Sequence, residues 1–397
     1  MNKHMLRLLA SVRFSFALAV SSVLLAGAQA SAQCPELTSG LERPLGITQT
    51  NQDNLLVAET GTAAPNTGRI SIVDLNGNRR TLLAGLPSGI NDVNEPSGPA
   101  GLFMRGRTLY AAIGVGDVGR PGPFPGTAVP NPNPPSSPIF SSVLAIHFSA
   151  DVEKSTEGFT LSLPDQQALS RGEKVTLSND GDNIEIKLVA NFPDFTPNPL
   201  PFFPGNVRLS NPFDLVVVAD QIYFTDGGQN MVRRVHIPTG SFSTLVAFPN
   251  IPNPLFGTIG GPFLEAVPTG IRYSDGQLLV TLFRGFPFPA GASQVQTIDP
   301  STAAQAPFIT GLKTAIDVLP IREGDDTDYL ALQHASGPGP LITPPGLVLR
   351  FETPSVPPTL VANCLVRPTS MTLDKKTGTL YVTELVTGRI VAIPVAP

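Results

Sequence analysis

Three polar residues in two repeats of the chain could bind a hard cation. Asp214 and Asp317 supply carboxylates and Asn211 supplies an amide oxygen, and calcium-like ions prefer several oxygen ligands. The comparable places of the other repeats carry no carboxylate; they are Gly46, Gly101, Gly270 and Ser370. So small a set favours a structural role, in which the aspartates line a wet channel or cap a strand. We therefore assign no cofactor on this evidence, and calcium or another divalent metal is the alternative.

A second group of acids ends one strand in each of three repeats. Glu59, Asp226 and Glu384 could ring the mouth of a channel. Each also precedes a turn with Gly or Thr, and carboxylates often accept backbone N–H groups from such turns. We favour the turn role.

Nucleophilic catalysis finds little support in the residue pattern. His147 and His236 end strands, whereas His334 opens a Pro/Gly-rich loop and is the best placed of the three. No nucleophile elbow and no zinc-binding helix motif accompanies them. We therefore expect a binding protein, with a metal-dependent hydrolase such as a lactonase as the alternative.

Phenylalanines gather in the long loops between strands, among many prolines. Proline stiffens a loop, which lowers the entropy lost when the loop holds a ligand. We predict that Phe202, Phe203, Phe286 and Phe288 border the main pocket, with His334 nearby. The ligand would be a small apolar molecule, a glycan or a protein; the alternative is that the rings only pack the loops down.

The elements that position these residues form a sixfold repeat of short apolar strands. The second strands of the repeats are residues 55–58, 109–112, 222–225, 278–281, 329–332 and 380–383. The third strands are residues 69–73, 142–146, 231–235, 294–298, 347–351 and 389–393. The last repeat lacks a fourth strand, and residues 36–41 provide a spare one. The pattern predicts an all-β, six-bladed β-propeller closed by the N-terminal strand, because closure removes exposed edges; a linear solenoid or two β-sandwiches fit less well.

The repeated phrases resemble a known family of proteins. The repeat units resemble those of NHL and SMP-30-type six-bladed propellers. The chain resembles the ScyD/ScyE family more closely, a group of exported propellers named from scytonemin pigment gene clusters. The phrases that carry this closer resemblance include Asn211-Pro-Phe-Asp-Leu, Gly346-Leu-Val-Leu-Arg-Phe and Thr387-Gly-Arg-Ile-Val. That resemblance implies export and a propeller fold, and it implies no established reaction. The SMP-30 resemblance implies the metal-dependent lactonase alternative.

The N-terminus has the order of a secretory signal peptide. Basic residues precede an apolar run at 14–25, and a small-residue cleavage pattern at 30–32 follows; the alternative is a single N-terminal membrane anchor. We expect residues 1–32 to be removed and 33–397 to form one secreted or periplasmic domain, with an insertion at about 151–186 in blade two and a hairpin around residues 179–181. A net charge of −5 argues against nucleic acid as a partner, no later segment could span a membrane, and we expect a monomer.

The two cysteines, Cys34 and Cys364, lead to opposing expectations. Export and an even count favour a disulfide. Alignment of the repeats places the cysteines at opposite ends of neighbouring outer strands, roughly 20 Å apart and beyond disulfide reach. Pairing would require the N-terminus to fold back.

Overall fold

Four-stranded antiparallel sheets repeat six times along the described part of the chain. The computed structural model describes residues 34–62, 64–324 and 326–395. From inner to outer strand, blades one to three are β2 (Pro44–Gln49), β3 (Leu55–Glu59), β4 (Gly68–Val73), β5 (Arg79–Leu86); β8 (Pro99–Arg105), β9 (Thr108–Ile113), β12 (Ser142–Phe148), β15 (Asp182–Asn191); and β18 (Pro212–Val218), β19 (Gln221–Asp226), β20 (Met231–His236), β21 (Phe242–Ala247). Blades four to six are β24 (Pro268–Ser274), β25 (Gln277–Leu282), β26 (Ser293–Ile298), β27 (Gln305–Leu312); β28 (Ala315–Glu323), β29 (Asp326–Gln333), β30 (Gly346–Phe351), β31 (Thr359–Leu365); and β32 (Pro368–Asp374), β33 (Thr379–Glu384), β34 (Arg389–Pro394), β1 (Glu36–Thr38).

The inner strands form a closed ring around a common axis. Each inner strand contacts the inner strands of both neighbouring blades, and the contact between β2 and β32 joins the first blade to the last. Threonines near the ends of second strands strengthen these contacts across blades. Thr281 Oγ1 donates to the Ile316 carbonyl at 3.2 Å, and Thr383 Oγ1 donates to the Leu45 carbonyl at 3.1 Å. The predicted six-bladed β-propeller is therefore confirmed.

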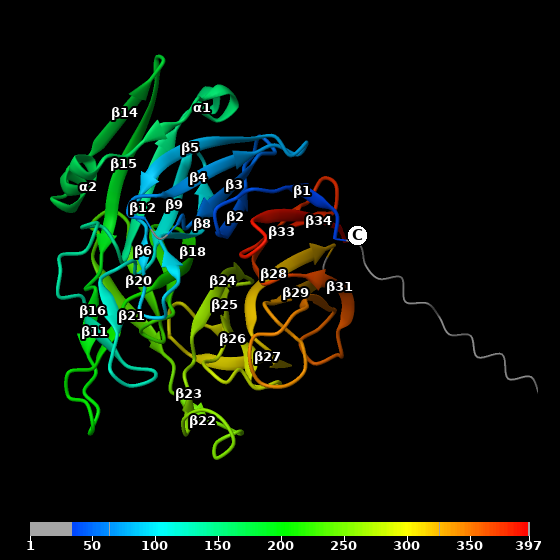
Figure 1. Ribbon diagram of the computed structural model, residues 1–397. Helices are drawn as coiled ribbons and strands as arrows, with labels where there is room; N and C mark the ends of the chain where they lie inside the picture. Colours follow the sequence, from blue (N-terminus) through cyan, green and yellow to red (C-terminus); the bar gives the residue numbers. More distant parts are fainter. Residues whose placement is uncertain (1–33, 63, 325, 396–397) are drawn as a thin grey trace, which may run out of the picture. The chain divides into compact units, whose positions relative to one another are not determined.

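The N-terminal strand completes the last blade, as the repeat pattern predicts. β1 pairs antiparallel with β34, with Glu36 opposite Val391 and Thr38 opposite Ile390. Figure 1 shows blue β1 beside red β34. Blade six is thus built from both ends of the described chain, and the spare N-terminal strand has the partner that the missing fourth strand left open.

Cys34 and Cys364 form a disulfide, so the distance inferred from the repeat alignment was wrong. Their Cα atoms lie 6.0 Å apart, and both residues pack on the apolar cluster between blades five and six. The alignment treated equal positions on neighbouring outer strands as equal heights. Adjacent strands of a sheet rotate by roughly 20–25°, so three steps turn an outer strand by roughly 60–75° from the inner one. Ends of neighbouring outer strands can therefore meet.

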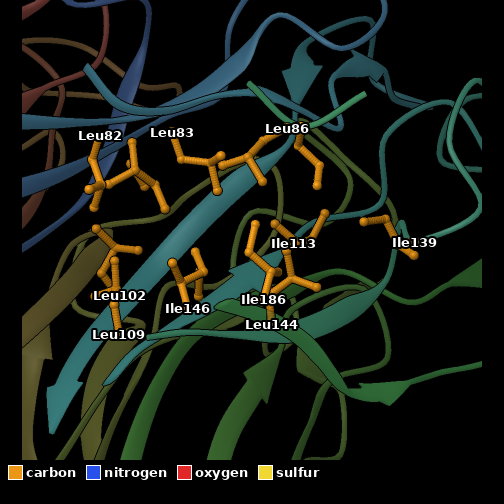
Figure 2. Close-up of a cluster of buried hydrophobic side chains, with 14 of the residues drawn as sticks. Leu82, Leu83, Leu86, Leu102, Leu109, Ile113, Ile139, Leu144, Ile146 and Ile186 are labelled. Atoms are coloured by element: carbon orange, nitrogen blue, oxygen red, sulfur yellow. The ribbon is translucent and has the colours of Figure 1, made fainter. Parts of the chain in front are cut away.

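The interior consists of Leu, Ile, Val and Phe packed between blades, as Figure 2 shows for blades one and two. Leu82 and Leu86 of β5 face Leu102, Leu109 and other residues of blade two, and all four are buried. Burial of one such side chain contributes about 1.5–3 kcal/mol. Apolar contact between blades is therefore the main force that holds the ring together.

The segment after β12 enlarges blade two and reaches blade one. β14 (Val175–Asn179) pairs with β15 across a two-residue turn, which confirms the predicted hairpin. Before it lie α1 (Ala150–Ser155), α2 (Leu163–Ser170) and β13 (Phe159–Thr160), which pairs with β5 of blade one. Glu153 of α1 is buried, accepts a hydrogen bond from Asn54 of blade one at 3.0 Å, and pairs with Arg107 of blade two at 2.8 Å. The segment therefore holds two blades together.

The long connections lie on one face, between second and third strands or between blades. Four of them contain small hairpins: β6 (Gly89–Ile90) with β7 (Pro96–Ser97), β10 (Gly119–Pro121) with β11 (Ala128–Pro130), β16 (Phe195–Pro197) with β17 (Val207–Leu209), and β22 (Ile251–Pro252) with β23 (Phe263–Leu264). We call this side the loop face. Among the described residues, no helix has the length and apolar character needed to cross a membrane.

Candidate functional site: a cup at the mouth of the channel

The residues at the axis form one layer, with one residue from each inner strand. They are Gly46, Gly101, Asp214, Gly270, Asp317 and Ser370. A Cβ on Gly101 would lie 2.4 Å from Asp214 Cα, and a Cβ on Gly270 would lie 2.8 Å from Asp317 Cα. Glycine is therefore needed at both positions, because the backbone of the neighbouring inner strand comes so close. The space left in this layer is only about 10 Å³, roughly the least that one ordered water needs.

Arg272 lies between the two axial aspartates and pairs with both. Its Nη1 is 2.6 Å from Asp214 Oδ2, and its Nη2 is 2.6 Å from Asp317 Oδ2. Arg272 follows Gly270 by two positions on β24, so both residues face the same side of the strand. This arginine was not foreseen from the sequence, although a cation on the axial side of an inner strand is a signal for a buried ion pair.

The remaining lone pairs of the two aspartates bind backbone N–H groups. Asp214 accepts from Ile271 of blade four at 3.0 Å, and Asp317 accepts from Met371 of blade six at 3.0 Å. Each carboxylate thus connects its own blade to the next. The pKa of Asp317 is raised to about 6. Burial is the main cause, the Asp214 carboxylate adds to it, and the attraction of Arg272 opposes it.

These contacts make the two aspartates poor candidates for metal ligands. The Arg272 guanidinium occupies the position between their carboxylates, and a divalent ion would have to displace it. The third candidate, Asn211, accepts a hydrogen bond from the Val115 N–H at 3.1 Å and lines the cavity above the axial layer. Within residues 34–62, 64–324 and 326–395, no cluster of three or more His, Cys, Asp or Glu residues could hold a metal.

A cavity of about 450 Å³ opens above the axial layer on the loop face. Its floor consists of residues that directly precede the axial positions: Leu45, Phe213, Thr269, Ile316 and Thr369. Apolar residues of the connections, such as Val115, Leu209 and Phe283, form its walls. Because the axial layer closes it from below, this space is a cup rather than a passage through the ring. We refer to it as the mouth cavity.

His334 lines the mouth cavity and is 6% exposed. Its Nδ1 is 2.9 Å from the Pro368 carbonyl oxygen, so Nδ1 carries the proton and donates. Phe283 packs against the imidazole with 5.7 Å between ring centroids. Burial lowers the pKa of His334 to about 4, which keeps the ring neutral at ordinary pH.

Charged residues line the rim of the mouth cavity. Asp92, Glu95 and Glu265 contribute three carboxylates, and Arg208, which pairs with Glu265, contributes one cation. Burial raises the pKa of Asp92, and the carboxylate of Glu265 raises it further.

The four phenylalanines that were predicted to border the main pocket do not line the mouth cavity. Phe202 and Phe203 pack edge-on against Phe124, with centroids 5.4 and 5.9 Å apart, and Phe286 contacts Phe288 at 6.1 Å. None of these rings lines the cavity, but Phe288 supports its wall by packing on Phe283 at 5.8 Å. The aromatic rings of the loops pack against one another because such contacts remove more apolar area from water than an exposed position at the rim of the cavity would. Of the predicted ligand-binding residues, only His334 faces the mouth cavity.

The acids at the ends of the second strands are fully buried and do not line the mouth cavity. Glu59, Asp226 and Glu384 pair with arginines of the third strands, and Glu59 Oε2 lies 2.8 Å from Arg69 Nη2. All three accept a backbone N–H from the link before the inner strand, as in the 2.8 Å bond from Asn211 to Asp226. Among the described bonds, only Asp226 also accepts a backbone N–H from the turn that follows, from Gln229 at 3.1 Å. The role of the three acids is thus structural, but the predicted turn bond is seen for one of them, and the arginines were not foreseen.

A second depression, of about 710 Å³, lies on the opposite face around Asp275, Asp328 and Arg350. Polar and charged side chains dominate its lining, and Arg350 pairs with Asp328 at 2.6 Å. It is larger than the mouth cavity but lacks an apolar floor.

The fold and the mouth cavity together define a closed six-bladed propeller with a cup on its axis. No family model and no curated protein sequence matches the chain. Solved structures with a similar fold include a gluconolactonase from Xanthomonas campestris, with a TM-score of 0.48 and 12% identity over 91% of this chain and 89% of that one. A putative oxidoreductase (glucose dehydrogenase) from Thermus thermophilus gives a TM-score of 0.44 and 14% identity over 91% of this chain and 100% of that one. These superpositions are too loose, and the identities too low, to transfer any residue's role.

Proposed function

We propose that this protein binds a small apolar molecule in the mouth cavity and does not catalyse a reaction on it. The observation that carries the proposal is the cup itself, about 450 Å³ with an apolar floor that is closed below. This volume lies within the ~300–1,000 Å³ typical of small-molecule sites. The lactonase alternative lacks a comparable observation, since its metal candidates are engaged by Arg272 and by backbone N–H groups.

Fluorescence titration with N-phenyl-1-naphthylamine, a neutral apolar probe, tests this proposal. The chain contains no tryptophan, so the naphthyl signal has little protein background. We expect saturable binding of one probe per chain. Leu45→Phe should weaken it at least fivefold, because the larger ring fills part of the cavity floor. Phe286→Ala is the matched control, since this ring lies outside the cavity.

Non-saturable binding, or equal affinity of the wild type and Leu45→Phe, would contradict the proposal. If Phe286→Ala weakened the probe more than Leu45→Phe did, the binding site would instead lie at the loop aromatics.

We also propose that the chain is exported, belongs with ScyD/ScyE-like propellers and acts as a monomer outside the cytoplasm. The Cys34–Cys364 disulfide supports export, because such bonds persist in oxidising compartments. The signal peptide itself lies outside the described residues. Intact mass of protein recovered from the periplasm should correspond to residues 33–397 with both cysteines oxidised; a mass that retained residues 1–32 would argue for an anchor.

A further inference from the structure

His334 presents a fixed hydrogen-bond acceptor to the mouth cavity. Its Nδ1–H donates to a carbonyl that can only accept, so Nε2 of the neutral ring carries a lone pair. No described residue donates a hydrogen bond to Nε2, although His334 is only 6% exposed. A bound apolar molecule would cover this acceptor, which is costly to leave unpaired once it is buried, and a donor on the same molecule would satisfy it.

The lining residues hold this acceptor rigidly. Phe283 contacts the imidazole edge-on, and Phe288 contacts Phe283 from behind. The Pro368 carbonyl fixes the other side of the ring. Nε2 therefore has one orientation, and a ligand must adapt to it.

The charges around the cavity select against anions. Three carboxylates and one guanidinium line the rim. Arg208 pairs with Glu265, and Arg43, just outside the lining, pairs with Glu95 at 2.6 Å. Asp92 is the rim carboxylate for which the described residues show no ion pair, so the rim keeps an excess of negative charge. A ligand carboxylate would meet these carboxylates and the lone pair of Nε2, and like charges repel most strongly where water is scarce.

We infer that the ligand of the mouth cavity is an apolar molecule that carries a neutral or cationic hydrogen-bond donor, an alcohol or an amine, and directs it at Nε2 of His334. This inference rests on the proposed function. It adds the chemical class of the ligand and the residue that recognises its polar end.

Three compounds with one ring system test the inference by calorimetry at pH 7.5. 2-Naphthylmethanol offers a donor, 2-(methoxymethyl)naphthalene lacks it, and 2-naphthoate is an anion. One net hydrogen bond corresponds to roughly a threefold to tenfold change in affinity. We expect the alcohol to bind about tenfold more tightly than the ether, and the naphthoate to bind most weakly.

His334→Asn tests the role of Nε2. The shorter amide can still donate to the Pro368 carbonyl near the position of Nδ1, but it places no acceptor at the position of Nε2. We expect the affinity ratio of alcohol to ether to fall to about one. His147→Asn, at an exposed position of β12 in the middle of blade two, is the matched control and should keep the ratio. In wild-type protein with ¹⁵N-labelled histidine, the alcohol, and not the ether, should shift the Nε2 resonance, which provides a readout if His334→Asn fails to fold.

The outcomes separate the two proposals. An ether or a naphthoate that binds as tightly as the alcohol overturns the inference while binding in the cavity stands. A tenfold preference that survives in His334→Asn overturns the role of Nε2. If none of the three compounds and no N-phenyl-1-naphthylamine binds saturably, the proposed function fails as well.

Discussion

Replacing Arg272 with methionine should destabilise the propeller strongly. The substitution removes the only cation that faces Asp214 and Asp317 among the described residues of the axial layer and leaves two carboxylates buried without a counterion. Loss of one partner of a buried ion pair costs about 3–5 kcal/mol. Because backbone N–H groups of two neighbouring blades bind the same carboxylates, we expect a loss of about 4 kcal/mol in the free energy of unfolding at pH 8.

Urea denaturation at several pH values measures this loss and its origin. Without Arg272, the pKa of Asp317 should rise beyond its present value of about 6. The folded variant would then bind a proton that the unfolded chain, with an aspartate pKa of about 3.9, does not bind. A group whose pKa is higher in the folded state stabilises the protein at low pH, and this contribution to the free energy of unfolding is lost as pH rises. The deficit should therefore be full at pH 8 and smaller at pH 5.

Two further variants make the reasoning refutable. Arg322→Met removes an exposed arginine that pairs with Asp275 at 3.2 Å and should cost at most about 1 kcal/mol. Asp214→Asn with Asp317→Asn in the Arg272→Met background should recover much of the loss, since the uncompensated charges are gone. If Arg272→Met costs no more than Arg322→Met, or if its deficit does not change with pH, the axial ion pairs do not stabilise the ring.

Four other measurements follow from the same structure. The pKa of His334 is about 4 in the folded protein and about 6.5 in the unfolded chain, so the free energy of unfolding should fall by ~3 kcal/mol as pH drops from 7 to 4. His334→Asn should lack this loss in urea titrations, and an equal loss in both proteins would assign the effect to other groups. Cys34→Ser with Cys364→Ser should lower the free energy of unfolding by about 2–5 kcal/mol, because the bond constrains 330 residues of unfolded chain, and free thiols in the unfolded, unreduced wild type would refute the pairing. Gly101→Ala should cost about 2–3 kcal/mol, since its Cβ would overlap the backbone of blade three, whereas Gly261→Ala, with open space around it and no positive φ, should show no overlap of this kind. Dialysis against EDTA should leave the melting temperature of the wild type unchanged; a fall of several degrees would restore the metal-site alternative.

The architecture could be predicted because the repeat is encoded locally. Each blade repeats short β-branched and aromatic strands with turn residues between them, and only a ring explains both a spare first strand and a missing last one. The pairing of β1 with β34 follows from that count. The cysteines were placed wrongly because their distance depends on the twist of whole blades, which no local pattern specifies.

The site was harder to predict, since its residues are set by contacts between blades. The loop face could be predicted because successive strands of a blade alternate in direction, and His334 could be placed on it because it opens a long loop. The mouth cavity lies on that face. The loop phenylalanines have no periodic pattern, so nothing in the sequence distinguishes a ring that lines a cavity from one that packs on another loop. Floor residues such as Leu45 and Ile316 were overlooked because they appear as ordinary strand residues.

The axial layer connects the fold to the proposed binding site. Three of its six positions are glycine, which offers no ligand atom on a side chain, and two of these glycines contact the backbone at an aspartate of the next blade. This close approach brings both carboxylates within reach of one guanidinium, and the ion pairs then fill the space that remains. An open channel would let water reach the floor of the mouth cavity from below and would weaken apolar binding. The same residues that form the ion pairs at the axis therefore close the cavity from below.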